Sequence, residues 1–283
     1  MKIVVTGATG QLGREMVLYF SKKDGYQVIG FPKEDWDVTQ AHQAIEILDR
    51  EQPDVLIHCA AFTDVDQSEE NAKIAFRVNG KGSRLLATHC QQRQIRMVYI
   101  STHYVFDGQK EVGYTEEDLP NPINQYGRSK ILGETWVSQL CSRHLIIRTS
   151  WLFGIHGDNF VRTILRKIKQ REALSISNDR VGSPTYTRHL IQQIDRLLQT
   201  DAVGIFHITN RGSCTRYQFA KRICEMANLN YPIQPIKAKV LRQKAVRPRY
   251  SVLLSPRREE LGLPELPHWK EGVQDFLKSI RSI

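Results

Sequence analysis

Cysteine is scarce in this chain, and its spacing forms no recognisable pair. The five cysteines among 283 residues are Cys59, Cys90, Cys141, Cys214 and Cys224, an odd number with no C-x-x-C motif. This pattern argues against a disulfide framework and against a zinc knuckle. Long apolar runs are also missing: none approaches the roughly 18 residues of a membrane span, and the run at 3–5 is too short for a secretory signal. We therefore expect a cytoplasmic protein with no membrane partner.

Acidic residues are outnumbered by basic ones. The chain has 40 Lys and Arg against 30 Asp and Glu, a formal net charge of +10, and residues 237–258 contain eight basic residues but no acidic one. Such an excess suits nucleic acid, an anionic membrane surface, an anionic small molecule, or simply a solvated basic face. No helix-turn-helix and no aromatic-basic RNA motif accompanies it. We expect no nucleic acid partner and favour an anionic small molecule among the functional interpretations.

Hydrophobic and charged residues, at 41% and 25%, are as frequent as in ordinary globular proteins. Short β-branched runs at 2–6, 26–31, 54–59 and 96–101 alternate with helical stretches at 12–20, 41–51 and 72–92. This alternation predicts an α/β fold, a Rossmann doubly wound parallel sheet. We assign residues 1–150, joined by part of 183–210, to this domain and residues 151–283 to a smaller C-terminal domain.

A glycine-rich loop follows the first predicted strand. Gly7, Gly10 and Gly13 form a G-x-x-G-x-x-G pattern that opens the first helix. Glycines there allow a tight turn and close approach of a dinucleotide pyrophosphate, which the free N–H groups of the helix would bind. The pattern predicts NADPH or NADH as cofactor. No carboxylate ends the second strand, where Lys33 favours NADPH, but the acidic residues 34–35 follow closely and keep NADH open.

Tyr126 and Lys130 form a Y-x-x-x-K pair at the head of a predicted helix. The i, i+4 spacing puts both side chains on one helical face. Because a nearby ammonium favours a phenolate, we expect the lysine to lower the pKa of the tyrosine from its usual value of about 10. A phenol tuned in this way exchanges a proton with a carbonyl or hydroxyl near neutral pH. The pair gains significance here because it follows a dinucleotide loop and a strand ending at Ser101 and Thr102.

Nine segments, in order along nearly the whole chain, resemble the extended short-chain dehydrogenase/reductases and, more closely, the dTDP-4-dehydrorhamnose reductase family. They are TGATGQLG (6–13), PDVLIHCAAFTDVDQSE (53–69), VNG (78–80), YISTHYVFDG (99–108), YTEEDLPNPINQYGRSKILGE (114–134), RTSWLFG (148–154), NFV (159–161), VGSPTYT (181–187) and RPRYSVL (247–253). The second segment and the fourth to sixth are far more specific than the glycine loop.

The resemblance implies a cofactor site, a catalytic triad and a substrate site. The cofactor would lie against Gln11, Leu12, Gly13, Asp37, Val38, Ala60, Ala61 and Phe62. The triad would be Thr102, Tyr126 and Lys130, with the last two also touching the cofactor. The nucleotide sugar would face Thr63, Thr102, His103 and Trp151, with Arg247 at its pyrophosphate and Asn159 as the best candidate in the loop after Trp151.

The implied reaction is reduction of the C4 ketone of dTDP-4-dehydro-β-L-rhamnose to dTDP-L-rhamnose, feeding rhamnose-containing polysaccharide synthesis. NAD(P)H would supply the hydride, Tyr126 the proton, and Thr102 would aim the ketone. Two alternatives stay open. One is another nucleotide-sugar epimerase or reductase, and the other is a non-catalytic nucleotide-sugar-binding regulator of the same fold.

His103 departs from the family pattern, and Glu15 raises the question of a metal site. His103 stands where the family usually has aspartate, so a titrating group replaces a fixed acceptor. Its contact with the sugar stays open. Some members bridge a dimer through magnesium held by glutamates, and Glu15 occupies one such position. One helix glutamate is not a metal site, so we predict no metal and expect a monomer or a homodimer.

Overall fold

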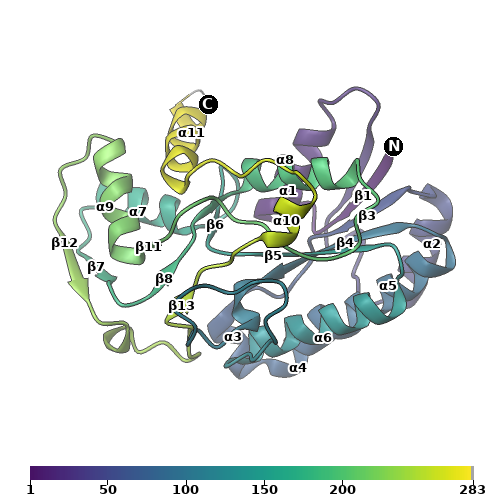
Figure 1. Ribbon diagram of the computed structural model, residues 1–283, viewed down its shortest axis with the longest axis horizontal. Coiled ribbons are helices and arrows are strands. Elements are labelled where there is room, and N and C mark those ends of the chain that lie inside the picture. Colours follow the sequence, from purple (N-terminus) through teal and green to yellow (C-terminus); the bar gives the residue numbers. More distant parts are fainter. Residues whose placement is uncertain (282–283) are drawn as a thin grey trace.

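The computed structural model describes residues 1–281, and a six-stranded parallel sheet forms its centre (Figure 1). The strands are β1 (Lys2–Thr6), β2 (Gln27–Phe31), β3 (Val55–His58), β4 (Arg96–Thr102), β5 (His144–Thr149) and β10 (Gly204–His207). Their order in space is β10-β5-β4-β3-β1-β2. In this register Val4 lies between Ile29 and Leu56. The predicted Rossmann-type α/β fold is confirmed.

Helices cover both faces of the sheet (Figure 1). One face carries α1 (Gln11–Phe20) and α8 (Thr187–Leu198), and the other carries α2 (Ala41–Glu51), α5 (Ser83–Gln92) and α6 (Gln125–Leu140). Successive residues of a strand point to opposite faces. Ile3 and Val5 therefore join the core under α1 and α8, whereas Val4 joins the core under α2 and α5. Burial on both faces explains the apolar run Ile3, Val4 and Val5 within β1.

The C-terminal part builds small sheets around a third core. β6 (Leu152–Phe153) pairs with β9 (Thr185–Tyr186), β7 (Leu174–Ser177) with β12 (Ile233–Ile236), and β8 (Val181–Gly182) with both β11 (Cys214–Thr215) and β13 (Tyr250–Ser251). The helices around the core are α7 (Phe160–Lys169), α9 (Arg216–Met226) and α11 (Trp269–Arg281). The remaining short helices are α3 (Val65–Glu70), η2 (His103–Val105), η3 (Ala238–Leu241) and α10 (Pro256–Glu260). In residues 1–281 no helix is both long and apolar enough to cross a membrane.

The single helix predicted at 72–92 is divided. A π-helical turn, η1 (Phe76–Gly82), separates α4 (Ala72–Ala75) from α5. The turn carries the fully buried Asn79, whose amide accepts from Phe62 N (2.8 Å) and donates to Phe62 O (3.0 Å) and Ser129 Oγ (2.9 Å). Turns of this kind occur frequently at functional sites. The apolar pattern did not reveal it because one wide turn hardly changes an amphipathic periodicity.

A buried ion pair fixes α6 to the sheet. Arg148 of β5 donates Nε to Glu134 Oε1 (3.0 Å) and Nη2 to Oε2 (2.6 Å), and Ser101 Oγ of β4 donates to Oε1 (2.5 Å). The two charged side chains are 2% and 5% exposed. Each needs the other, because an uncompensated charge in such a place is strongly unfavourable.

Replacing Arg148 by alanine should lower the free energy of unfolding by about 3–5 kcal/mol, because Glu134 would remain as an unpaired buried charge. Urea unfolding followed by circular dichroism measures the change. The control is Lys167→Ala, which removes a half-exposed ion pair with Glu172 and should cost at most about 1 kcal/mol. Equal losses in the two variants would contradict a special role for the buried pair.

Candidate active site

A cavity of about 720 Å³, the first cavity, opens at the carboxyl ends of the central strands. β2 lies on one side of β1 and β3 on the other, so the loops that leave β1 and β3 diverge. Ligands of doubly wound sheets bind in the crevice formed at such a reversal. The loops after β1, β3 and β4 all contribute to the wall of this cavity.

The glycine loop lies directly against the end of β3. Gly7 has φ +67°, and a Cβ atom added there would stand 2.7 Å from Ala60 N. A Cβ atom on Gly13 would stand 2.2 Å from Gly7 O. Gly7 is required by both its left-handed backbone conformation and the crowding, whereas Gly13 is required by the crowding alone. The loop therefore leaves its backbone accessible at the start of α1.

The wall of the first cavity contains polar groups that lack a partner. No side chain caps the first turn of α1, which begins at Gln11. Among the described residues, the buried atoms Gln11 Oε1, Trp36 Nε1 and Thr149 Oγ1 have no hydrogen-bond partner, and all three residues line this cavity. Buried polar atoms are nearly always paired in folded proteins. The free helix N-terminus and the glycine cradle fit a dinucleotide pyrophosphate.

The end of the first cavity beyond β2 is cationic. Lys33 and Arg77 line it together with Asp37. Burial alone would raise the pKa of Asp37, but bonds from Thr39 N and Oγ1 and the charges of Lys33 and Arg77 lower it. Within residues 1–281 the structure gives neither cation a hydrogen bond or an ion pair of its own. Arg77, on the π-helical turn, was not a candidate from the sequence.

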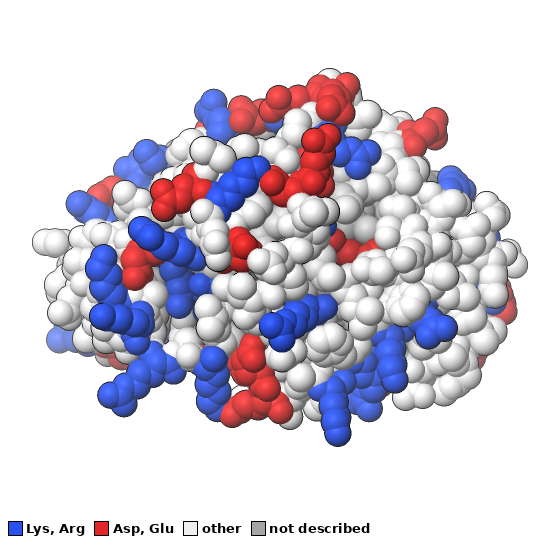
Figure 2. All heavy atoms as spheres, turned by 60° about the horizontal axis from the view of Figure 1, so that its bottom comes forward, with Lys and Arg blue, Asp and Glu red and all other residues white. Residues whose placement is uncertain are grey.

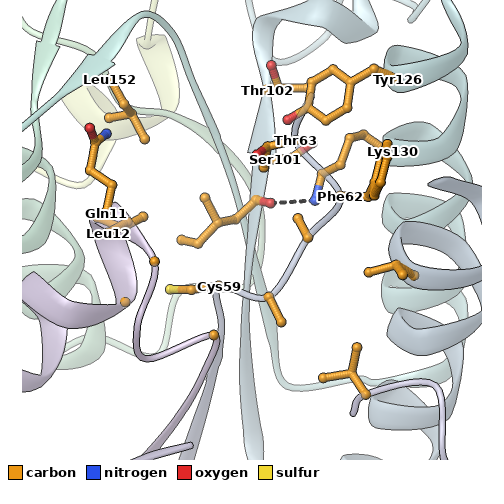
Figure 3. Close-up of a pocket in the computed structure, with 18 of the residues that line it drawn as sticks. Gln11, Leu12, Cys59, Phe62, Thr63, Ser101, Thr102, Tyr126, Lys130 and Leu152 are labelled. Carbon is orange, nitrogen blue, oxygen red and sulfur yellow. Dashed lines mark hydrogen bonds between the residues drawn. The ribbon is translucent and has the colours of Figure 1, made fainter. Parts of the chain in front are cut away.

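Thr102, Tyr126 and Lys130 meet in the middle of the first cavity (Figure 3). Thr102 ends β4, and the other two lie one turn apart near the start of α6. Asn124 caps that helix by accepting from Gly127 N at 2.8 Å. Figure 3 shows the Tyr126 ring beside Thr102 and the Lys130 ammonium donating to Ile100 O at 2.8 Å. Phe62, which is held by the Asn79 amide, and Thr63 lie close by.

Burial controls the ionisation of this group. It raises the pKa of Tyr126 well above the usual range, with a smaller contribution from Tyr104 and a hydrogen bond with Thr102 that acts the other way. It also lowers the pKa of Lys130 to about 7, although the charge of Glu134 opposes this. The lowered tyrosine pKa expected from the sequence is therefore not found. The ammonium is held by a backbone carbonyl, and the phenol stays protonated.

A second cavity of about 420 Å³ adjoins the first, because His103, Tyr104 and Trp151 line both. Its wall carries three arginines from separate parts of the chain: Arg180, Arg216 and Arg247. Arg216 stacks on Trp151, with its guanidinium carbon 3.8 Å from the ring centroid. The sequence analysis identified only Arg247. Figure 2 shows that Lys and Arg also gather on the nearby surface formed by the C-terminal elements.

The three arginines repel one another in this cavity. Burial, together with the charges of Arg180 and Arg247, lowers the pKa of Arg216 to about 10. Arg247 is held differently: burial alone would lower its pKa, but hydrogen bonds to Asp66 raise it. All three remain charged near neutral pH, so the cavity is built for an anion.

His103 forms part of the wall between the two cavities. The residue is 5% exposed, its ring packs at a tilt against Tyr104 with centroids 4.3 Å apart, and Nδ1 lies 3.4 Å from Thr149 O. Burial and the charge of Arg216 lower its pKa to about 3. The imidazole is therefore neutral at physiological pH and does not titrate there, in contrast to the expectation from the sequence.

Asn159 is the one predicted site residue that lines neither cavity. Its side chain caps α7, accepting from Arg162 N (3.1 Å) and donating to Gly154 O (2.8 Å), and these bonds turn it away from the site. Glu15 is buried and accepts from Thr187 Oγ1. Burial raises its pKa. In the described part of the chain no cluster of three His, Cys, Asp or Glu residues is arranged to hold a metal ion.

Known proteins resemble this chain over nearly its full length. The family model described as RmlD substrate binding domain matches residues 1–282. The spore coat polysaccharide biosynthesis protein SpsK of Bacillus subtilis is 36% identical over 277 residues, covering 98% of this chain and 97% of that protein. A dTDP-4-keto-6-deoxy-D-glucose reductase of Streptomyces niveus is 37% identical, covering 95% and 94%.

The fold also matches solved structures closely. The structure of dTDP-4-dehydrorhamnose reductase from Bacillus anthracis in complex with NADP is 38% identical and superposes with a TM-score of 0.95, covering 98% of this chain and 99% of that one. The agreement of family model, relatives and structure means that this chain belongs to the RmlD substrate-binding-domain family, the dTDP-4-dehydrorhamnose reductases that its motifs predict.

Proposed function

We propose that this protein reduces the C4 ketone of dTDP-4-dehydro-β-L-rhamnose to dTDP-L-rhamnose. The observation that carries the proposal is that the first cavity, which contains Thr102, Tyr126 and Lys130, adjoins the arginine-lined second cavity at His103, Tyr104 and Trp151. Thr102 directly precedes His103, and the Tyr126 ring lies 5.5 Å from the Tyr104 ring. A hydride donor in the first cavity and a nucleotide-linked sugar in the second would bring the reacting groups together at this junction. The relatives named as 4-keto-sugar reductases support the same reaction class.

The cofactor would occupy the first cavity, with its pyrophosphate at Gln11, Leu12 and Gly13 and its adenine beside Asp37 and Val38. When bound, NADPH or NADH supplies a hydride. The walls formed by Ala60, Ala61 and Phe62 would orient the dinucleotide and exclude water. The cations Lys33 and Arg77 suit a 2′-phosphate better than a ribose hydroxyl, so we propose a preference for NADPH.

Tyr126 is the proposed proton donor. Its raised pKa keeps the phenol protonated, as a general acid requires. Thr102 would donate to the ketone oxygen and hold it near the phenol. Lys130 carries a charge that its surroundings disfavour. That charge would become favourable when a phenolate forms beside it, so the lysine stabilises the late stage of proton transfer.

The second cavity is the proposed site of the nucleotide diphosphate. Arg180, Arg216 and Arg247 match the two negative charges of a diphosphate diester, and Trp151 with His103 would contact the sugar at the junction. We accordingly propose that residues 1–150 with α8 and β10 bind the cofactor and that residues 151–283 mainly bind the substrate. The electrostatic match does not depend on which 6-deoxy sugar is attached.

A coupled assay tests the reaction itself. dTDP-4-dehydro-β-L-rhamnose and dTDP-4-keto-6-deoxy-D-glucose are each generated in place, and NADPH oxidation is followed at 340 nm, the wavelength where reduced nicotinamide absorbs. NADPH oxidation with dTDP-4-dehydro-β-L-rhamnose supports the proposal. NADPH oxidation with dTDP-4-keto-6-deoxy-D-glucose alone would instead mean that the protein is a reductase of that second sugar. Tight binding without oxidation of NADPH or NADH would favour a regulatory protein.

Tyr126→Phe should lower kcat by about 10²- to 10⁴-fold, because the proton donor is removed while the ring and its packing remain. Dissociation constants for NADPH and for dTDP, measured by calorimetry, should change little. Tyr114→Phe is a suitable control, since its hydroxyl bonds Asp107 on the loop outside both cavities. Normal turnover by Tyr126→Phe would reject the proposed proton donor.

Removing the two cations near Asp37 should change the cofactor preference. In Lys33→Ala/Arg77→Ala, we expect the dissociation constant for NADPH to rise by about tenfold or more, since charge-assisted hydrogen bonds to a phosphate would be lost. The constant for NADH should change less than twofold. Fluorescence titration of both reduced cofactors gives the ratio. A parallel loss for both would contradict a 2′-phosphate contact.

Lys130→Met should stabilise the protein in the absence of cofactor, because the buried ammonium is held at a cost. A lysine whose folded-state pKa is about 7 binds fewer protons than the unfolded chain at pH values between 7 and 10.5. The free-energy cost of burying the charged ammonium is therefore greatest at pH 7 and below, and it decreases as the pH rises toward 10.5. We expect Tm to rise by about 3 °C or more at pH 6.5, with a much smaller gain at pH 9.5. A gain independent of pH would point to packing instead.

A further inference from the structure

Arg247 is held by a carboxylate from the other side of the cleft. Its guanidinium donates Nη1 to Asp66 Oδ1 (2.6 Å) and Nη2 to Oδ2 (2.7 Å), a two-pronged arrangement. Asp66 lies on α3, directly after the loop that follows β3, whereas Arg247 lies 181 residues later in the chain. Nothing in either local sequence predicts that these two side chains meet.

Asp66 itself lines neither cavity, whereas Arg247 lines the second. The Asp66 side chain is 34% exposed, and that of Arg247 is 12% exposed. Of the three arginines, Arg247 is the one that Asp66 is hydrogen-bonded to, whereas Arg180 feels only its charge. Asp66 therefore acts on a ligand in the second cavity mainly through Arg247.

The same contact anchors the whole segment 243–248, which borders the second cavity. Ala245 N donates to Asp66 Oδ1 (2.8 Å), and Asn124, the cap of α6, donates Nδ2 to Val246 O (2.8 Å). Lys244 pairs with Glu70 at the exposed end of α3. The segment is thus tied to the helix that carries Tyr126 and Lys130. Helix α6 therefore supports both the wall of the second cavity and the reacting groups Tyr126 and Lys130.

Electrostatics explains why such an anchor is needed. Burial acts to lower the pKa of Arg180, Arg216 and Arg247, and Tyr104 acts to raise the pKa of each, so three like charges lie around one residue of the wall. Without an anchor, the flexible side chain of Arg247 would turn toward solvent, because its two arginine neighbours repel it. A bidentate carboxylate fixes the planar guanidinium group and offsets the repulsion between the arginines. Less conformational entropy is therefore lost when an anion binds.

We propose that Asp66 is a positioning residue that preorganises Arg247 for a diphosphate in the second cavity. The proposal rests on the proposed function, because it takes the diphosphate of a nucleotide sugar as the ligand. Asp66 makes no contact with the substrate and takes no part in proton or hydride transfer. It sets the affinity for the nucleotide sugar and leaves the chemical step unchanged.

The test uses Asp66→Asn in the full-length chain, with dTDP as the probe of binding. Asparagine keeps an oxygen that can accept from Ala245 N and removes the charge and the second acceptor of the guanidinium. The dissociation constant for dTDP, measured by calorimetry, should rise about tenfold, the scale of one charge-assisted contact. The KM for the keto sugar should rise by the same factor. Both kcat and the dissociation constant for NADPH should stay within about twofold.

Three variants separate positioning from a general loss of charge or fold. Glu70→Gln makes the same change on the same helix and breaks the tie to Lys244, and it should leave the dTDP affinity unchanged. Asp66→Glu should restore part of the affinity, because it restores the carboxylate. In an Arg247→Ala background, Asp66→Asn should have almost no further effect, because the residue it acts through is gone.

Several results would overturn the inference. They are unchanged dTDP affinity in Asp66→Asn, an equal loss in Glu70→Gln, additive losses in the double variant, and tighter binding in Asp66→Asn, which would mean that Asp66 competes with the ligand for Arg247. In all four cases the wild-type protein still reduces the keto sugar. A wild-type protein that neither binds dTDP nor oxidises NADPH would instead reject the proposed function, and the inference with it.

Discussion

The attachment of α6 to the sheet is the contact on which the site depends. Tyr126, Lys130 and Glu134 follow one another at intervals of four residues, so all three face the strands. Glu134 is bonded to Arg148 of β5 and to Ser101 of β4, the residue just before Thr102. The helix cannot turn about its axis without breaking this buried pair. The relation of phenol, ammonium and threonine is therefore set by a salt bridge one turn away from the reacting groups.

Polar burial is concentrated at this place, and it has a chemical purpose. Burial disfavours the charged form of both reacting groups, because it lowers the pKa of Lys130 and raises the pKa of Tyr126. Gln11, Trp36 and Thr149 carry polar atoms that the protein does not satisfy. Such groups lower stability, and proteins retain them mainly where a ligand or a reaction completes them.

Much of this organisation was predictable from the sequence, because the informative signals are local. The glycine loop directly follows its strand, and the two members of the Y-x-x-x-K pair are four residues apart. The cavity linings include the predicted Thr63, His103 and Trp151. Asn159 caps α7 in the structure, a role that looks the same as a ligand contact in a sequence. The tyrosine pKa was misjudged because burial, a property of the whole fold, outweighs the neighbouring lysine.

The arginine cluster marks the limit of prediction from the sequence and shows why net charge is a poor guide to function. Most of the basic residues between 237 and 258 serve the fold or the surface: Arg257 donates to Ile205 O and Val203 O, and Arg258 to Leu263 O. Only Arg247 of that run reaches the second cavity. Its two companions come from the approach to β8 and the start of α9. What creates an anion site is the convergence of a few guanidinium groups in three dimensions, one of which is held by the carboxylate of Asp66.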